Sequence, residues 1–270
     1  MTDPVLPRVL LVGRGKMGGA LWSGWLRKGL APSVVLDRHG TAVPAPHRVA
    51  KTPADIPQDF QPDFIILAVK PVAAADAIAA IAPWLPGAVL ISVMAGRTVA
   101  GLRDIAGRSG CRPPVLRAMP NTPAEIGQGI TGAYASDDVS PARRAQAEAL
   151  LSAVGAVAWV TDEAQIDIVT AISGSGPAYV FLLAELLEKT GLAHGLPAQT
   201  ARLLARGTVS GAGALLAVSP EESDTLRRNV TSPNGTTAAA LSVLMTSEAW
   251  PKTIDQAISA AAARARELAQ

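Results

Sequence analysis

Two stretches of this chain, one near each end, have the residue types and spacing that bind anions. The first is Thr231-Ser232-Pro233-Asn234-Gly235-Thr236-Thr237, in which four hydroxyls lie beside a Pro and a Gly, just before a helical run that begins at Ala238. Pro fixes one backbone angle, and Asn and Gly readily adopt left-handed conformations, so N–H groups can converge on one point. At a helix start, this pattern predicts an uncharged cradle for a small carboxylate or phosphate.

The second stretch is Gly13-Arg14-Gly15-Lys16-Met17-Gly18, which follows a β-rich run over residues 8–13 and leads into a predicted helix over residues 17–28. In such loops the first Gly permits a tight turn, the second lets the backbone approach a pyrophosphate, and the third lets the helix pack on the strand. The strand before the loop and the helix after it favour a dinucleotide site over a simple helix start. Together, the two stretches predict an enzyme that holds a small anionic substrate against a nicotinamide.

The choice between NAD and NADP depends on the residues after the second predicted strand. Asp37 ends that strand, where an acid bonds the ribose 2′-hydroxyl and favours NAD, although Asp is equally typical of a turn. Arg38 follows, where a guanidinium could stack on adenine or bind a 2′-phosphate. Arg14 and His39 could add positive character. The sequence leaves both cofactors open.

Three further loops leave the predicted sheet at its carboxyl edge, where ligands bind in open α/β folds. Lys70, in Ala68-Val69-Lys70-Pro71, could contact a ribose or a substrate carboxylate, or be a surface lysine at a helix start. Met94-Ala95-Gly96 has small residues that could admit a nicotinamide ribose. Asn121 lies in a rigid polar loop with two prolines, residues 117–123, which could fix a ring or an amide or be only a stiff turn.

These loops require strands that alternate with helices. Strands are predicted over residues 8–13, 34–36, 64–69, 88–93, 115–118 and 155–160, and helices over residues 17–28 and 72–82. The alternation predicts a parallel sheet covered on both faces, in a Rossmann-type dinucleotide-binding domain over residues 1–162. Over residues 163–270 only helical spacing appears, which predicts an all-helical second domain and hence an α/β + α protein.

Small residues recur at two places in the helical half. Ser173-Gly174-Ser175-Gly176-Pro177 would let a backbone or a ligand come close, or is an ordinary helix start with Pro in its first turn. Gly207 and Gly211 lie four apart on one predicted helix face and permit a close helix crossing, inside the domain or between subunits. A core shared by two subunits would cover the apolar surface of a small helical domain.

The composition of the chain limits the classes of function that it can have. Only 17% of the 270 residues are charged, the net charge is +2 and no basic cluster appears, so nucleic acid is not expected as a partner. One cysteine, Cys111, excludes an intramolecular disulfide, and with three isolated histidines it makes no metal-ligand pattern. Residues 77–96 are uncharged, but Pro83 and Pro86 interrupt them, and the N-terminus does not read as a signal peptide. A soluble, cytoplasmic protein without a membrane span is expected.

Taken in order along nearly the whole chain, these motifs resemble the pyrroline-5-carboxylate reductase family. The most specific of them are residues 117–123 and 231–237. The resemblance implies reduction of the cyclic imine 1-pyrroline-5-carboxylate to proline with NADPH or NADH, the last step of proline biosynthesis. It also implies a Rossmann domain joined to a helical dimerisation domain that interlocks with a partner subunit, as homodimers or rings of dimers.

The resemblance also implies roles for the site residues. Gly235, Thr236 and Thr237 would hold the substrate carboxylate with support from Ser232, and Thr237 would lie near the imine nitrogen. This cradle would serve a cofactor bound by the neighbouring subunit, so that the site spans the dimer. The residues expected to bind the cofactor, from the loops above and from the resemblance, are Gly13, Gly15, Lys16, Met17, Gly18, Asp37, Arg38, Ala68, Val69, Lys70, Pro71, Ala95, Gly96 and Asn121.

The chain departs from the family pattern at the cradle, where the family has Ser-Pro-Gly-Gly-Thr-Thr and this chain has Asn234 in place of the first Gly. Asn is among the residues that best tolerate a left-handed backbone, so the cradle is expected to survive, with some strain, if Asn234 takes a positive φ. Upstream, Glu221-Glu222-Ser223-Asp224 replaces a His-Pro-Gly-like turn and Arg228 replaces an acid.

The expected chemistry agrees with the absence of a histidine from these motifs. A cyclic imine can arrive already protonated, so positioning of the ring and neutralisation of its carboxylate would provide most of the rate. Thr237 is expected to donate a hydrogen bond to the nitrogen and to pass in a proton. Two alternatives stay open: a reductase of a different cyclic imine or related small carboxylate, and a non-catalytic NAD(P)-binding sensor or scaffold.

Overall fold

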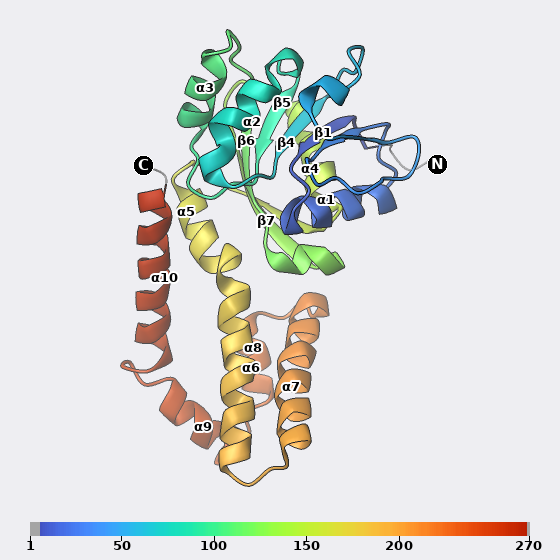
Figure 1. Cartoon of the computed structure of the whole chain (residues 1–270). Coiled ribbons are helices and arrows are strands. Elements are labelled where there is room, and N and C mark those ends of the chain that lie inside the picture. Colours follow the sequence, from blue (N-terminus) through green and yellow to red (C-terminus); the bar gives the residue numbers. More distant parts are fainter. Residues whose placement is uncertain (1–5, 269–270) are drawn as a thin grey trace. The chain divides into compact units, whose positions relative to one another are not determined.

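The computed structural model describes residues 6–268, which form an eight-stranded sheet with helices on both faces and then a series of helices (Figure 1). Contacts divide the chain into two compact units: Met1–Ser175 with Ala261–Gln270, and Gly176–Ala260. The α/β + α fold class that the sequence predicts is confirmed. The domain boundary at residue 163 stays a prediction.

The sheet places the candidate loops at one edge. Its strand order is β3-β2-β1-β4-β5-β6-β7-β8, and β1 to β6 run parallel. The strand order reverses between β1 and β4, and such a switch point opens a crevice at the carboxyl ends of the strands. The strands are β1 (Val9–Val12), β2 (Val34–Leu36), β3 (Arg48–Ala50), β4 (Phe64–Leu67), β5 (Val89–Ser92), β6 (Val115–Met119), β7 (Gly129–Ala135) and β8 (Gly155–Trp159).

All six predicted strands are confirmed, but the sheet is not wholly parallel. β7 runs antiparallel to β6, and β8 runs parallel to β7. The sequence pattern missed β7 because two glycines weaken its strand signal. Gly132 serves packing instead: an added Cβ would lie 2.3 Å from the side chain of Val169, the last residue of the helix α5 (Gln165–Val169), so only Gly lets this helix approach the strand. The three-residue β3 was missed as well, since it is too short for a pattern.

Helices cover both faces of the sheet because successive strand residues point to opposite sides. Leu11 belongs to a core that includes Trp25 and Leu150, and Leu10 belongs to the other core, together with Leu102. The helices of this unit are α1 (Lys16–Arg27), α2 (Ala74–Ala80), α3 (Val99–Gly107), α4 (Pro141–Ser152) and α5 (Gln165–Val169), with a π-helix η5 (Thr170–Gly174) and 3₁₀ turns η1 (Pro53–Asp55), η2 (Pro71–Ala73), η3 (Ala82–Trp84) and η4 (Thr122–Ile126).

The second unit is helical throughout, as predicted, and it leaves much apolar surface uncovered. Phe181 is 66% exposed and Leu203 is 72% exposed. Gly207 and Gly211 face open space, because an added Cβ would meet no atom within 4 Å, so neither makes a helix crossing inside the chain. The helices are α6 (Gly176–Ala193), α7 (Ala198–Val218), α8 (Ser223–Asn229), α9 (Thr236–Leu244) and α10 (Trp250–Leu268), the last of which continues into the first unit.

One helical stretch, Gln165–Ala193, is long and apolar enough to cross a membrane by length and composition alone. It comprises α5, η5 and α6. The sequence analysis considered only residues 77–96 as a candidate membrane span and missed this stretch. The uncharged residues 77–96, by contrast, divide among α2, η3 and β5, so the prolines interrupt them as predicted.

A nearly buried ion pair joins three elements of the first unit. Arg117 Nη1 lies 3.0 Å from Glu163 Oε1, and the two side chains are 5% and 26% exposed. The same oxygen accepts the Val99 N–H at 2.7 Å. Glu163, in the segment that leads into α5, therefore ties the middle of β6 to the first turn of α3.

We expect Glu163→Ala to lower the free energy of unfolding by about 2–3 kcal/mol, because it leaves the Arg117 guanidinium buried without its counter-charge. Urea unfolding followed by circular dichroism measures the change. The double variant Arg117→Met/Glu163→Met should recover much of the loss, since it removes both charges. A single variant as stable as the wild type would show that the pair does not support the fold.

Candidate active site

The three glycines of the first loop have three different structural roles. Gly13 has φ +89°, which turns the chain sharply out of β1. An added Cβ at Gly18 would lie 2.2 Å from the Gly13 carbonyl oxygen, so α1 can approach the strand only with Gly here. An added Cβ at Gly15 would meet nothing within 4 Å. Gly15 therefore faces open space, as a close backbone approach to a ligand requires.

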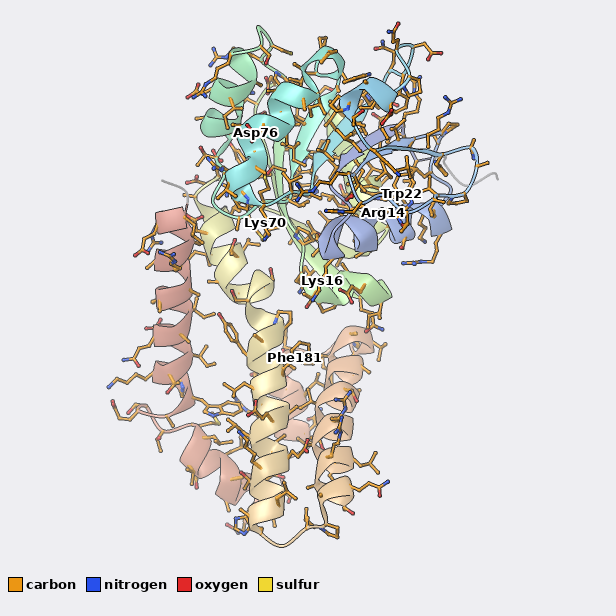
Figure 2. All side chains as sticks on the ribbon, viewed as in Figure 1. Arg14, Lys16, Trp22, Lys70, Asp76 and Phe181 are labelled. Carbon is orange, nitrogen blue, oxygen red and sulfur yellow. The ribbon has the colours of Figure 1, made fainter. Side chains whose placement is uncertain are left out.

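The first turn of α1 can bind an anion. Its N-cap is Gly15, no side chain caps it, and it contains no acidic residue. The first N–H groups of a helix have no intrahelical acceptor, and they attract negative charge. Figure 2 shows the side chains of Arg14 and Lys70 on loops at this edge of the sheet and that of Lys16 at the start of α1. The loop thus fits the pyrophosphate of a dinucleotide.

Asp37 holds the turn that follows β2. One carboxylate oxygen accepts the Arg14 N–H at 2.6 Å, and the other accepts the His39 N–H at 2.8 Å. The turn role considered for Asp37 is therefore present in the structure, while contact with a ribose stays a prediction. Arg38 is exposed and bonds only the neighbouring imidazole of His39, at 3.1 Å, among the side-chain hydrogen bonds found in residues 6–268.

The loops after β4 and β5 adjoin the glycine loop. The Ala68 N–H donates to Val12 O at 2.9 Å, which continues the pairing of β4 with β1. Gly96 has φ +68°, and an added Cβ would lie 2.4 Å from Leu268 O at the end of α10. The other predicted residues here differ in exposure: Met17, Ala68 and Val69 are half-buried against the cores, whereas Lys16 and Lys70 are exposed.

Asn121 uses its side chain to connect two segments. Its Nδ2 donates to Ser173 O in η5 at 3.1 Å, and its Oδ1 accepts the Ile130 N–H at 2.9 Å. The residue is 8% exposed. π-Helices are rare and occur frequently at functional sites. Contact of Asn121 with a nicotinamide stays a prediction, and the structure adds a role in holding the π-helix that precedes Ser175-Gly176-Pro177.

The second stretch has the backbone conformation that the proposed cradle requires, while its binding of a carboxylate stays a prediction. Asn234 has φ +58° and is the one non-glycine residue among residues 6–268 with a positive φ. The Gly235 N–H donates to Ser232 O at 3.1 Å, and the first helical bond of α9 runs from the Ala239 N–H to Gly235 O. The N–H groups of residues 236–238 consequently have no intrahelical acceptor. No acidic residue lies in this turn, so it suits a small anion.

The predicted residues form two groups. All predicted cofactor residues lie in the first unit, on loops or in the first turns of helices at the carboxyl ends of β1, β2, β4, β5 and β6. All predicted substrate residues, Ser232 and Gly235 to Thr237, lie in the second unit. Within residues 6–268 no three His, Cys, Asp or Glu side chains are grouped to hold a metal ion. The predictions missed Arg97, whose guanidinium bonds the Pro71 carbonyl, because a single arginine in a loop has no sequence signature.

Comparisons with known proteins agree with this arrangement. Residues 163–268 match the family model for pyrroline-5-carboxylate reductase dimerisation, and residues 8–96 match the one for coenzyme F420-dependent NADP oxidoreductase. The chain is 39% identical to the pyrroline-5-carboxylate reductase of Pseudomonas aeruginosa, over 98% of this chain and 97% of that protein. It is similar to the solved structure of a pyrroline-5-carboxylate reductase from Coxiella burnetii, with a TM-score of 0.87, 30% identity, and 98% and 99% of the two chains covered.

A further solved structure, pyrroline carboxylate reductase of Plasmodium falciparum with NADP bound, has a TM-score of 0.80 and 25% identity, and covers 98% of each chain. The fold and the site define an oxidoreductase with a Rossmann-like dinucleotide domain and a helical dimerisation domain. The chain belongs to the pyrroline-5-carboxylate reductase family.

The glycine roles lead to opposite expectations for two similar substitutions. Gly15→Ala should leave the free energy of unfolding unchanged or raise it by up to about 1 kcal/mol, because the backbone there (φ −70°) accepts Ala. It should weaken NADPH binding by about tenfold or more, since the methyl group occupies the space next to the free N–H groups. Gly18→Ala should lower the free energy of unfolding by about 2 kcal/mol or more, because its Cβ would clash with backbone.

Thermal unfolding and fluorescence titration with NADPH measure both effects. If Gly15→Ala bound NADPH as tightly as the wild type does, the ligand would not approach this backbone.

The conformation of Asn234 leads to a second expectation. Asn234→Gly should retain wild-type stability and KM for the imine, because Gly adopts a positive φ freely. Asn234→Val should cost about 2 kcal/mol, since a β-branched residue is strained at φ +58°, and should raise the KM for the imine. Steady-state kinetics and urea unfolding of both variants test this, and equal behaviour of the two would show that the cradle does not need the left-handed residue.

Proposed function

We propose that this chain reduces 1-pyrroline-5-carboxylate to L-proline with NAD(P)H, the last step of proline biosynthesis. The observation that carries the proposal is the presence, in one family member, of two separate anion sites built from free helix N–H groups: an open glycine loop at α1 and an uncharged cradle at α9. The first suits the pyrophosphate of a dinucleotide, and the second suits the single carboxylate of a small imino acid.

In this proposal the first unit holds the cofactor, NADP or NAD. Gly13, Gly15, Lys16, Met17 and Gly18 would bind the pyrophosphate, and Asp37 and Arg38 would meet the adenosine ribose. The loops that would line the nicotinamide and its ribose comprise Ala68, Val69, Lys70, Pro71, Ala95, Gly96 and Asn121. When bound, the reduced nicotinamide supplies a hydride to the imine carbon.

The cradle would bind and orient the substrate. The N–H groups of residues 236–238 are free of intrahelical acceptors, and the hydroxyls of Ser232, Thr236 and Thr237 add donors. A carboxylate held there fixes one side of the five-membered ring, and Thr237 would donate a hydrogen bond to the ring nitrogen and pass in a proton. Because the carboxylate meets only neutral donors, a ring that is already protonated is not repelled.

A homodimer would complete the site. α6 and α9 contain no buried residue in the single chain, and Phe181 on α6 is 66% exposed, so this surface needs a partner (Figure 2). The match to a dimerisation model over residues 163–268 supports a second copy as that partner. It also accounts for the apolar stretch Gln165–Ala193 without a membrane. We propose that the cradle of one subunit serves the cofactor of the other, that rings of dimers form, and that the protein is soluble and cytoplasmic, without a nucleic-acid partner.

The assay that tests the activity follows oxidation of NADPH and of NADH at 340 nm with five- and six-membered cyclic imino acids. Turnover of the five-membered imine well above that of the six-membered one supports the proposal, and the ratio of the two cofactors decides what Asp37 and Arg38 leave open. Preference for the larger ring would identify a reductase of a different imine. Cofactor binding without turnover would identify a sensor or scaffold.

Thr237→Ala should lower kcat/KM for the imine by about 10²-fold, because it removes the hydroxyl proposed to supply the proton. Thr237→Ser, which keeps the hydroxyl, should retain most of the activity. Thr246→Ala is a matched control, since that threonine follows α9 and its hydroxyl bonds only Val243 O, at 3.2 Å, among residues 6–268. Unchanged kinetics in Thr237→Ala would exclude the proposed role.

A further inference from the structure

We propose that Arg97 is a positioning residue that holds the loop Ala68–Pro71 in the conformation that binds the cofactor. The inference rests on the proposed function, because it concerns the same nucleotide site. Arg97 Nε and Nη2 donate to the Pro71 carbonyl oxygen at 3.1 and 2.8 Å. The guanidinium thus donates two hydrogen bonds to one backbone oxygen of a neighbouring loop. Hydrogen bonds from a charged donor are about twice as strong as those between neutral groups.

The Pro71 carbonyl lies where the loop changes direction. Lys70 is extended (ψ 144°), Pro71 begins η2, and the Ala74 N–H also donates to Pro71 O. Lys70 is exposed, and its side chain has no hydrogen bond or ion pair among residues 6–268, so only the position of its backbone limits the region that its ammonium can reach. Because Arg97 holds the next residue along the chain, it limits the positions that Lys70 and Ala68 can adopt.

The loop that carries Arg97 is itself held on two sides. Gly96 contacts the Leu268 carbonyl at the end of α10 so closely that an added Cβ would lie 2.4 Å from that oxygen. Two residues beyond Arg97, the Val99 N–H donates to Glu163 Oε1 at 2.7 Å, and Thr98 caps α3 by accepting the Gly101 N–H. Arg97 therefore links a loop that is anchored at α3 and α10 to the loop that follows β4.

The charge of Arg97 gives the link a second effect. Within residues 6–268 no acidic side chain forms an ion pair with Arg97, although the residue is half-buried. Its positive charge at the carboxyl edge of the sheet consequently favours a ligand with negative phosphates. Lys at this position would keep the positive charge but could not donate both hydrogen bonds to the Pro71 carbonyl, whereas Met would lose the charge and the hydrogen bonds.

The test compares Arg97→Lys, Arg97→Gln and Arg97→Met with Arg108→Met, in the full-length protein. Arg108 is exposed at the end of α3, and its side chain has no hydrogen bond or ion pair among residues 6–268, so it is a matched control. The dissociation constant of NADPH is measured by fluorescence titration without imine, and kcat, the KM for the imine and the unfolding temperature are measured separately.

We expect Arg97→Met to raise the dissociation constant of NADPH about tenfold and Arg97→Lys to raise it about threefold, with Gln between them. The KM for the imine and the unfolding temperature of the Arg97 variants should equal those of the control variant Arg108→Met. A purely structural link would instead lower the unfolding temperature and leave NADPH affinity unchanged, and this result would overturn the inference.

If Arg97→Met does not fold, the Lys and Gln variants decide by the same measurement. Failure of the wild type to turn over the imine would refute the proposed function. Wild-type turnover with equal NADPH affinity in all Arg97 variants would refute this inference alone.

Discussion

The approach of α1 to the end of β1 is the constraint on which the nucleotide site depends. The Gly18 Cα lies so near the Gly13 carbonyl that no side chain fits between them, and this contact directs the first turn of the helix toward the carboxyl edge of the sheet. The free N–H groups and the helix dipole then attract an anion without any side chain. The loops after β4 and β5 are placed by the same sheet, through the pairing of β1 with β4 and β4 with β5.

The cradle in the second unit also presents free N–H groups at the start of a helix, but its backbone enters the helix differently. Here the chain reaches the helix through a left-handed residue, Asn234, and a Gly235 N–H that bonds back to Ser232 O. In the proposed reaction such a neutral cradle would hold one carboxylate without repelling a cationic imine, and the cofactor would supply the difficult step. Neither of the two proposed anion sites, residues 13–18 and 231–237, contains a histidine.

Much of this could be predicted from the sequence because the signals are local. Six strands, the glycine loop and the helical second half follow from runs of neighbouring residues, and the structure confirms them. The antiparallel β7 could not be predicted, since its Gly132 serves a contact with Val169, which lies far along the chain. The contacts of Arg97 with Pro71 and of Asn121 with Ser173 could not be predicted either, because each joins residues that only the folded sheet brings together.

By itself, then, the sequence determined the local backbone chemistry: where glycine must turn the chain, where a helix must start, and that position 234 carries a residue able to adopt a positive φ. Only the tertiary structure decided how side chains are used, as with Asp37, whose carboxylate accepts the N–H groups of Arg14 and His39. The physical reason is the distance along the chain over which each kind of interaction acts. Dihedral preferences act within a few residues, whereas hydrogen bonds and close packing depend on which segments the sheet places next to one another.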